Sequence, residues 1–171
     1  MRTPSRPPKS RREPLDRATI VAGAVAFADA HGIDGLSMRK LGESLGVEAM
    51  SLYNHISNKS DLLAGMIDVV FAEIDLPDSG GSALWTDELR TRSNSLREAL
   101  ARHPWAITLM DSSPTPGPHT LRHHNAVIGC LRAAGFTVAM TAHAFSAIDS
   151  YVYGFAMQEK SLPFETPEET T

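Results

Sequence analysis

The sequence predicts an all-α protein made of two helical units. Apolar residues recur at spacings of three and four along most of the chain, which is the period of an amphipathic helix. The clearest turn signal, Pro-Asp-Ser-Gly-Gly-Ser at residues 77–82, divides this pattern into two parts. No alternation of apolar and polar residues is long enough to predict a strand. We expect a basic arm at 1–15, helical units at 16–76 and 83–160, and a tail at 161–171.

Composition and charge narrow the class of protein. The chain has 171 residues, of which 42% are hydrophobic and 21% charged, as in an ordinary globular protein. Residues 1–60 contain nine Lys or Arg and six Asp or Glu, whereas the remaining residues contain seven and fourteen. A basic first third followed by an acidic remainder predicts that a polyanionic partner contacts only the first third.

Three features predict a protein of the cytosol. Cys130 is the only cysteine, so the chain cannot form an internal disulfide. The apolar run at residues 20–28 follows arginines, as in a signal peptide, but the acidic Glu13 and Asp16 interrupt the basic leader and the apolar side chains share one helical stripe. No apolar stretch approaches the roughly 20 residues needed to span a bilayer, so no membrane partner is expected.

Caps and turns predict four helices in the first unit. Their expected bounds are Asp16 to about His31, Ser37 to Gly46, Glu48 to Ile56, and Asn58 onward. Ser37 and Asn58 are typical N-caps, because their side chains accept hydrogen bonds from backbone N–H groups of the first turn. Gly32 and Gly46 supply the left-handed conformation that often ends a helix.

Three longer helices are expected in the second unit. Their apolar stripes are Trp85, Leu89, Leu96 and Leu100; Leu121, His124, Ile128 and Leu131; and Met140, Ala144, Ile148, Tyr151, Val152 and Phe155. Pro104 closes the first of these helices, residues 112–118 form a loop, and Gly135 ends the second helix. Each stripe is predicted to face the core.

Two short helices that meet at a glycine turn, with a longer helix before and after them, form a helix-turn-helix arrangement. Five apolar residues hold the two short helices at a steep angle: Leu41, Leu45, Val47, Leu52 and Ile56. This packing leaves the outer face of residues 48–55 free to enter a DNA major groove, which is about 12 Å wide.

The outer face carries groups suited to base edges and to a thymine methyl group: Ala49, Met50, Ser51, Tyr53, Asn54 and His55. Arg39, Lys40 and Lys59 flank this face and are predicted to contact phosphates. The alternative is a small helical bundle whose surface residues have no such role. A helix-turn-helix pattern alone does not decide between the two.

The segment from Ser37 to Leu63 resembles the DNA-binding domain of the tetracycline-repressor (TetR) family. The resemblance lies in Leu45-Gly-Val-Glu48, Leu52-Tyr53, His55 and Asn58-Lys59. It implies that the following residues occupy positions that contact operator DNA in the family: Arg39, Ser51, Tyr53, His55 and Lys59. The tetracycline repressor has Gln-Pro and Trp where this chain has Ala49-Met50 and Asn54, so we expect a different operator sequence.

The second unit is similar to the C-terminal domain of the same family. Its landmarks are Trp85, Arg97, His103-Pro104-Trp105, Pro116-Gly117-Pro118, Gly135-Phe136 and Tyr151-Val-Tyr-Gly154. The two resemblances cover residues 16–160 and imply that the second unit dimerises and holds a small inducer. Six aromatic or flexible residues suit an apolar pocket, although core filling is the default role of each: Trp85, Trp105, Leu109, Met110, Phe145 and Tyr151.

Two departures limit what the resemblance implies. The tetracycline repressor uses a histidine in the region that reads Ile107 to Asp111 here, where none is present, so a magnesium-tetracycline inducer is not expected. Family members usually continue beyond the helix ending near Gln158, which leaves the dimer contact in doubt or implies a truncated chain. Small residues at every fourth position of this helix, Ala142, Ser146, Ser150 and Gly154, permit close helix packing within one chain or across a two-fold axis.

Catalytic and metal sites are less favoured. His119 and His123 are four residues apart, as paired zinc ligands can be, but no nearby Cys, Asp or Glu completes a ligand set. Ser112 and Ser113 beside Asp111 lack the strand-turn-helix elbow of a hydrolase nucleophile. We therefore expect no metal, no cofactor and no enzyme activity.

The sequence thus predicts a DNA-binding transcriptional regulator. The first reading is a repressor that binds a palindromic double-stranded operator as a homodimer and is released by a small, largely apolar effector. The alternative is a helical small-molecule-binding protein whose DNA binding is impaired because its C-terminal dimerisation helices are truncated. Neither the operator sequence nor the inducer follows from the residues.

Overall fold

The computed structural model of the chain describes residues 15–78, 84–110 and 115–159, and these residues are helical with no strand. The α-helices are α1 (Arg17–His31), α2 (Met38–Leu45), α3 (Ala49–Leu52), α4 (Lys59–Ala72), α5 (Trp85–Arg102), α6 (Pro118–Ala133) and α7 (Val138–Glu159). Two 3₁₀ helices, η1 (Ile33–Gly35) and η2 (Pro104–Thr108), complete the set. The all-α prediction is confirmed. None of the described helices is both long enough and apolar enough to cross a membrane.

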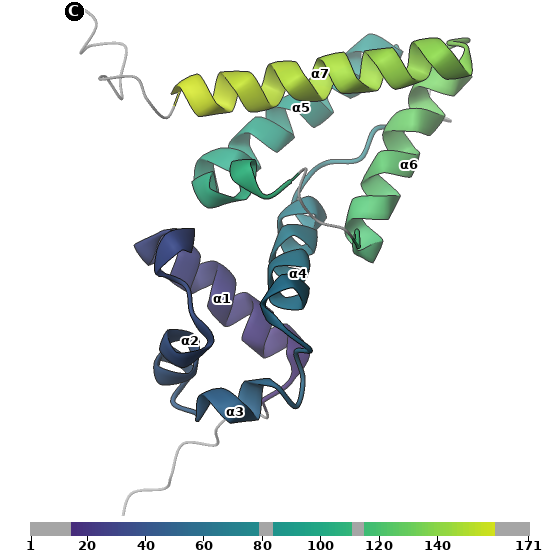
Figure 1. The fold of residues 1–171 in the computed structure, drawn as a ribbon. Coiled ribbons are helices and arrows are strands. Elements are labelled where there is room, and N and C mark those ends of the chain that lie inside the picture. The colour runs from purple at the N-terminus through teal and green to yellow at the C-terminus, as the bar shows by residue number, and fades with distance from the viewer. Residues whose placement is uncertain (1–14, 79–83, 111–114, 160–171) are drawn as a thin grey trace, which may run out of the picture.

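The helices form two groups that meet at α4 (Figure 1). Helices α1 to α4 lie at one end of the molecule, with α2 and α3 farthest from α7. Helices α5, α6 and α7 lie at the other end. Helix α4 contacts both α1 and α6, so it belongs to the packing of both groups.

The predicted caps of the first group are confirmed. The Ser37 hydroxyl accepts a hydrogen bond from the Lys40 backbone N–H at 3.2 Å, and the Asn58 side chain accepts one from the Asp61 N–H at 2.9 Å. Gly46, with φ +67°, ends α2 in the left-handed conformation that favours glycine. Local sequence chemistry therefore fixes where α2 and α4 begin and where α2 ends.

The third helix is shorter than the predicted range of 48–56. Helix α3 ends at Leu52, and tight turns follow it through His55. The His55 N–H still donates to the Leu52 carbonyl at 3.0 Å, as does the Ile56 N–H at 2.9 Å. These bonds keep Leu52 and Ile56 on one buried side, as the sequence predicted.

The predicted inward faces of α6 and α7 are partly wrong. Leu121 and Ile128 are 53% and 44% exposed, and Tyr151 is 72% exposed. The buried face of α6 is instead Thr120, His123, Val127, Cys130 and Leu131, and that of α7 is Thr141, Asp149, Val152 and Ala156. Because polar side chains take inward positions, an apolar stripe does not mark the buried side of these helices.

One hydrophobic core joins both groups of helices. It contains residues from seven elements: Ile20 of α1, Leu41 of α2, Leu52 of α3, Met66 of α4, Leu96 of α5, Ala106 of η2 and Val152 of α7. Leu89, Leu96 and Leu100 of α5 are buried as predicted, whereas Trp85 is partly exposed. The predicted arm and tail lie almost entirely outside the described residues, and so do Asp111, Ser112 and Ser113.

Candidate functional site

The outer surface of α3 and its following turn rests on a rigid base. Leu41, Leu52 and Ile56 are fully buried beneath it. A β-carbon placed on Gly42 would lie 2.9 Å from the Val47 carbonyl oxygen and 3.1 Å from the Ala49 nitrogen, so α2 approaches the backbone of α3 as closely as a glycine allows. The position of the outer surface relative to α2 is therefore set by direct backbone contact.

The predicted base-contacting residues lie together on this outer surface. Met50 is 72% exposed and Tyr53 is 45% exposed. Asn54 and His55 are exposed, and Ala49 and Ser51 are half-buried. We call these six residues the reading surface: Ala49, Met50, Ser51, Tyr53, Asn54 and His55.

The three predicted phosphate contacts are also exposed. Lys40 lies in the first turn of α2 and Lys59 is the first residue of α4. Arg39 forms an ion pair with Glu43 one turn later, at 2.9 Å, and both side chains are largely in solvent. An exposed pair of this kind is worth little, so Arg39 can exchange Glu43 for a phosphate at small cost.

A bidentate ion pair holds the start of α4 against α1. The Arg17 guanidinium donates to both carboxylate oxygens of Asp61, at 2.9 and 2.6 Å. The Asp61 carboxylate also accepts from the Ser57 backbone N–H at 2.8 Å. The hydrogen bond from Arg17 lowers the pKa of Asp61, so the pair stays ionised at neutral pH. This contact holds the start of α4, where Lys59 lies two residues before Asp61.

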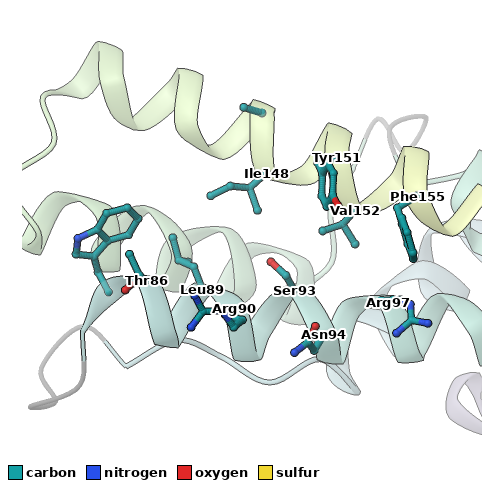
Figure 2. Close-up of a pocket in the computed structure, with 12 residues that line it drawn as sticks. Thr86, Leu89, Arg90, Ser93, Asn94, Arg97, Ile148, Tyr151, Val152 and Phe155 are labelled. Atoms are coloured by element: carbon teal, nitrogen blue, oxygen red, sulfur yellow. The ribbon is translucent and has the colours of Figure 1, made fainter.

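The six predicted pocket residues do not line one cavity. Trp85 of α5 and Tyr151 of α7 both line a groove of about 680 Å³ between these two helices. Figure 2 shows this groove, with Leu89 and Arg97 on α5 opposite Tyr151 and Phe155 on α7. Both helices contribute apolar and polar groups to it.

The other four predicted pocket residues lie elsewhere. Trp105 is buried and donates from its indole nitrogen to the Asp29 carboxylate at 2.7 Å. Leu109 and Met110 pack against the core shared by both groups of helices. The Phe145 ring stands perpendicular to the His124 ring, with centroids 5.3 Å apart, in the space between α6 and α7.

The end of α5 is tied to the first group through His103. Its Nδ1 lies 2.8 Å from an Asp29 carboxylate oxygen of α1, and its Nε2 lies 3.2 Å from a Glu73 oxygen at the end of α4. Arg102 donates to the other oxygen of Glu73 at 2.8 Å. The His103-Pro104-Trp105 motif therefore connects α5 and η2 to α1 and α4.

A second connection joins α4 to the start of α6. The buried Asp68 carboxylate of α4 accepts from both the backbone N–H and the hydroxyl of Thr120, at 2.9 and 3.0 Å. A β-carbon on Gly117 would overlap the Asp68 carboxyl group, so a larger residue there would have to displace this carboxylate. The start of α6 is therefore bonded directly to α4.

A buried polar cluster lies among α5, α6 and α7, and two of its members were not predicted as site residues. Arg92 is only 1% exposed. Its Nε donates to His123 Nε2 at 2.9 Å, and its Nη1 lies 2.6 Å from the Asp149 carboxylate. We call Arg92, His123 and Asp149 the buried polar cluster. The available signal was the position of Arg92 between Leu89 and Leu96, on the inward stripe of α5.

The structure gives His123 a partner other than a metal. No group of three or more His, Cys, Asp or Glu side chains is placed to hold a metal ion in the parts of the chain that the structure describes. Burial lowers the pKa of His123 to about 3, and the positive charge of Arg92 contributes to this shift. His123 is therefore neutral at pH 7 and accepts the Arg92 hydrogen bond with its unprotonated Nε2.

Acidification is expected to destabilise the chain through His123. As the pH falls below the ordinary value of 6.5, the unfolded state binds the proton first, because the pKa of the folded state is about 3. The stabilisation that depends on neutral His123 is thus complete above pH 6.5 and is lost between pH 6.5 and pH 3. Over this range the free energy of unfolding falls by up to about 1.4 kcal/mol per pH unit. Urea unfolding of the parent and of His123→Gln at stepped pH measures this slope.

The variant is expected to lose less stability than the parent between pH 6 and pH 4. His143→Gln, at an exposed position of α7, is the matched control and should follow the parent. Identical pH slopes for the parent and for His123→Gln would show that the buried imidazole does not couple folding to pH.

Two family models match the chain. The model described as "Bacterial regulatory proteins, tetR family" covers residues 20–66, which include α2, α3 and the reading surface. The model described as "Tetracyclin repressor-like, C-terminal domain" covers residues 76–170. The two matched ranges do not overlap, and together they cover most of the chain.

Individual proteins support the same assignment. An HTH-type transcriptional regulator of Saccharopolyspora erythraea is 40% identical over 156 residues, which are 90% of this chain and 66% of that protein. The chain thus spans just under two thirds of the length of this relative. ActR of Streptomyces coelicolor in complex with actinorhodin is 28% identical with a TM-score of 0.79, covering 87% of this chain and 71% of that one.

A DNA complex is also among the similar structures. BioQ with its double-stranded DNA operator is 28% identical to this chain and has a TM-score of 0.74. The match covers 88% of this chain and 90% of that chain. The similarity therefore includes one protein solved with a small molecule and one solved with DNA.

Proposed function

The chain belongs to the tetracycline-repressor family of bacterial regulatory proteins, and on this premise we propose that it is a repressor that binds a palindromic operator. In this proposal the reading surface enters the major groove, and Arg39, Lys40 and Lys59 contact the phosphates on either side. A homodimer presents two reading surfaces to one operator. A small effector that binds among α5, α6 and α7 releases the DNA.

The observation that carries the proposal is the reading surface itself. Met50, Tyr53, Asn54 and His55 project into solvent from a base in which Leu52 and Ile56 are fully buried. Exposed hydrogen-bonding and apolar groups on α3 and on the turn that follows it match the donors, acceptors and methyl groups of the major groove. The adjacent basic residues supply the attraction for phosphate that does not depend on sequence.

The effector is proposed to act through α4. Helix α6 is tied to α4 by the hydrogen bonds from Thr120 to Asp68, and α4 begins at Lys59 beside the reading surface. Two reading surfaces have to lie about 34 Å apart to enter successive major grooves. A ligand that favours a different spacing weakens DNA binding, and a coupling of roughly 1–3 kcal/mol corresponds to a 5- to 150-fold loss.

Three of the predicted pocket residues stay candidates for the effector site. Trp85 and Tyr151 line the groove between α5 and α7, and Phe145 lies between α6 and α7. Trp105, Leu109 and Met110 are weaker candidates, because they belong to the core that α1 and α4 share with α5. We propose a largely apolar effector, since aromatic and aliphatic side chains surround these positions.

Selection of bound DNA from a random pool tests the proposed function. We expect enrichment of an inverted repeat whose half-sites are about 10 base pairs apart, centre to centre. The selected sequences report binding, operator sequence and half-site spacing together. Recovery of no common sequence, or of a single unpaired half-site, would contradict a dimeric operator-binding protein.

Lys59→Ala and Tyr53→Ala are expected to affect DNA binding differently. Loss of a phosphate contact at Lys59 should weaken binding to all sequences and reduce the salt slope of the binding constant by about 1. Tyr53→Ala should instead change which operators are preferred. Titrations of selected and scrambled operators at several salt concentrations separate the two effects. Arg122→Ala, at an exposed position of α6, is the charge-matched control and should bind like the parent.

If Lys59→Ala binds DNA as tightly as the parent at every salt concentration, Lys59 does not contact a phosphate. If Tyr53→Ala loses the same affinity for every operator, Tyr53 does not read the base sequence.

A further inference from the structure

The groove between α5 and α7 has an apolar wall and a polar wall (Figure 2). The residues that line it from α7 are all apolar or aromatic, and Tyr151 and Phe155 are the largest of them. Helix α5 instead contributes mostly polar side chains, among them Arg90, Ser93 and Asn94. The volume of the groove, about 680 Å³, lies within the range of small-molecule sites, which is roughly 300–1,000 Å³.

The charged groups that line the groove are both positive. They are Arg90 and Arg97, and none of the described lining residues is acidic. The surrounding chain has the opposite balance, because residues 61–171 contain seven Lys or Arg and fourteen Asp or Glu. Two of these seven cations therefore lie at one groove, which favours an anionic ligand.

Arg90 is the cation that is better placed to bind a ligand. It donates from Nη1 to Asp87 at 2.7 Å, and both side chains are more than half exposed. An exposed pair of this kind is worth little, so a ligand carboxylate can share Arg90 with Asp87 or replace it. Arg97 is more fully engaged, because its Nε and Nη2 donate to the two carboxylate oxygens of Glu159. Its guanidinium also lies over the Phe155 ring.

Exposed aromatic rings indicate what the rest of the ligand is. Tyr151 is 72% exposed, Phe155 43% and Trp85 38%. The Tyr151 and Phe155 rings are nearly parallel, with centroids 6.3 Å apart and an angle of 23° between their planes. Aromatic rings prefer offset-stacked or edge contacts with other rings, so these side chains favour a planar aromatic body over a saturated one.

We propose that the groove between α5 and α7 is the effector site and that it binds a planar aromatic carboxylic acid. The planar Arg90 guanidinium holds the carboxylate, whose two oxygens match its donors, and the rings of α7 contact the aromatic body. The carboxyl end of α5 is bonded to the first group of helices through Arg102 and His103. A ligand that changes the packing of α5 on α7 therefore acts on a helix that is bonded to α4. This inference rests on the proposed function, of which it names the effector class and its site.

Three probes test the ligand class on the full chain: 2-naphthoate, 2-naphthamide and decahydro-2-naphthoate. The amide keeps the aromatic rings without the charge, and the decahydro acid keeps the charge and the ring skeleton without the aromatic faces. Isothermal titration calorimetry at pH 7 measures the three affinities. We expect 2-naphthoate to bind about fivefold more tightly than the amide, which is the upper end for an exposed ion pair. It should bind about threefold more tightly than the saturated acid, because only its rings stack on those of α7.

Substitutions at two exposed positions assign these preferences to side chains. Arg90→Gln should abolish the preference for 2-naphthoate over the amide, whereas Arg122→Gln, at an exposed position of α6, should keep it. Tyr151→Leu should lower the preference for the aromatic acid over the saturated acid, and Tyr151→Phe, which keeps a ring, should retain it. Because Arg90 and Tyr151 are largely in solvent, these variants are expected to fold.

Operator titration with and without saturating 2-naphthoate tests the regulatory role of the groove. We expect operator affinity to fall about fivefold or more in the parent, and to fall less in Arg90→Gln at the same probe concentration. Binding of 2-naphthoate without any change in operator affinity would show that the groove is not the effector site.

Equal affinity for 2-naphthoate and its amide, tighter binding of the saturated acid, or preferences unchanged in Arg90→Gln would each overturn the ligand class. Probe binding that weakens as the chain associates at higher protein concentration would show that a second copy covers the groove instead. A chain that selects an operator from the random pool but does not prefer 2-naphthoate keeps the proposed function and loses this inference. A chain that prefers 2-naphthoate but selects no operator keeps the ligand class and loses its regulatory role.

Discussion

Replacing Gly42 with alanine is expected to disrupt the helix-turn-helix and abolish operator binding. The added β-carbon would lie 2.9 Å from the Val47 carbonyl oxygen and 3.1 Å from the Ala49 nitrogen, and backbone atoms cannot rotate away as side chains do. Helices α2 and α3 therefore have to separate. Overpacking of this kind costs roughly 1–3 kcal/mol of folding free energy. Urea unfolding and operator titration measure the two effects.

Gly154→Ala is the matched control for this substitution. Gly154 also lies inside a helix, α7, but nothing in the described chain lies within 4 Å of its β-carbon position. Alanine should stabilise α7 by about 0.5–1 kcal/mol, because it loses less backbone freedom than glycine on folding. A Gly42→Ala protein that is as stable as the parent and binds the operator equally well would show that the close approach of α2 to α3 is not required.

Replacing Asp149 with asparagine is expected to cost about 3–5 kcal/mol of folding free energy. Arg92 would remain buried with its charge no longer balanced, since Asp149 is the carboxylate beside it at 2.6 Å. Denaturant unfolding at pH 7 measures the loss. The unfolding midpoint of Asp149→Asn should be lower than that of the parent at every protein concentration. A change in oligomeric state would instead make the difference depend on protein concentration.

Glu43→Gln removes the carboxylate from another arginine pair and serves as the control. Arg39 and Glu43 are 76% and 60% exposed in their side chains, so water replaces the lost partner. We expect a change of less than about 1 kcal/mol. Comparable losses for Asp149→Asn and Glu43→Gln would mean that the Arg92 charge is not confined to a dry site.

The first group of helices could be predicted closely because its chemistry is local. Ser37 and Asn58 cap helices through hydrogen bonds to residues three positions away, and Gly46 ends α2 through its own φ angle. Such features are complete within a few residues of sequence. The same local pattern predicted that Tyr53 and His55 are exposed, although both lie in the turn after α3 and not in the helix itself.

The second group could not be predicted as closely because distant side chains decide it. His123 lies four residues after His119, which is a spacing that paired metal ligands can have. Its partner in the structure is Arg92, which is 31 residues away on another helix. Leu121 and Ile128 have helical spacing but face outward, because Thr120 and His123 occupy the inward face. Hydropathy cannot predict polar residues that are buried because they pair with each other.

The contacts of His103 and Trp105 restrict how this protein can be recombined with its relatives. Both residues come after the turn that the sequence predicts at 77–82, yet their side chains bond to Asp29 of α1. A chimera joined at that turn would set the first four helices against foreign side chains at this position and leave the Asp29 carboxylate without its two donors. To exchange DNA specificity between two relatives, a chimera would therefore have to take η2 from the same protein as the amino-terminal helices. Otherwise it would have to keep, at position 29, the residue of the protein that supplies η2.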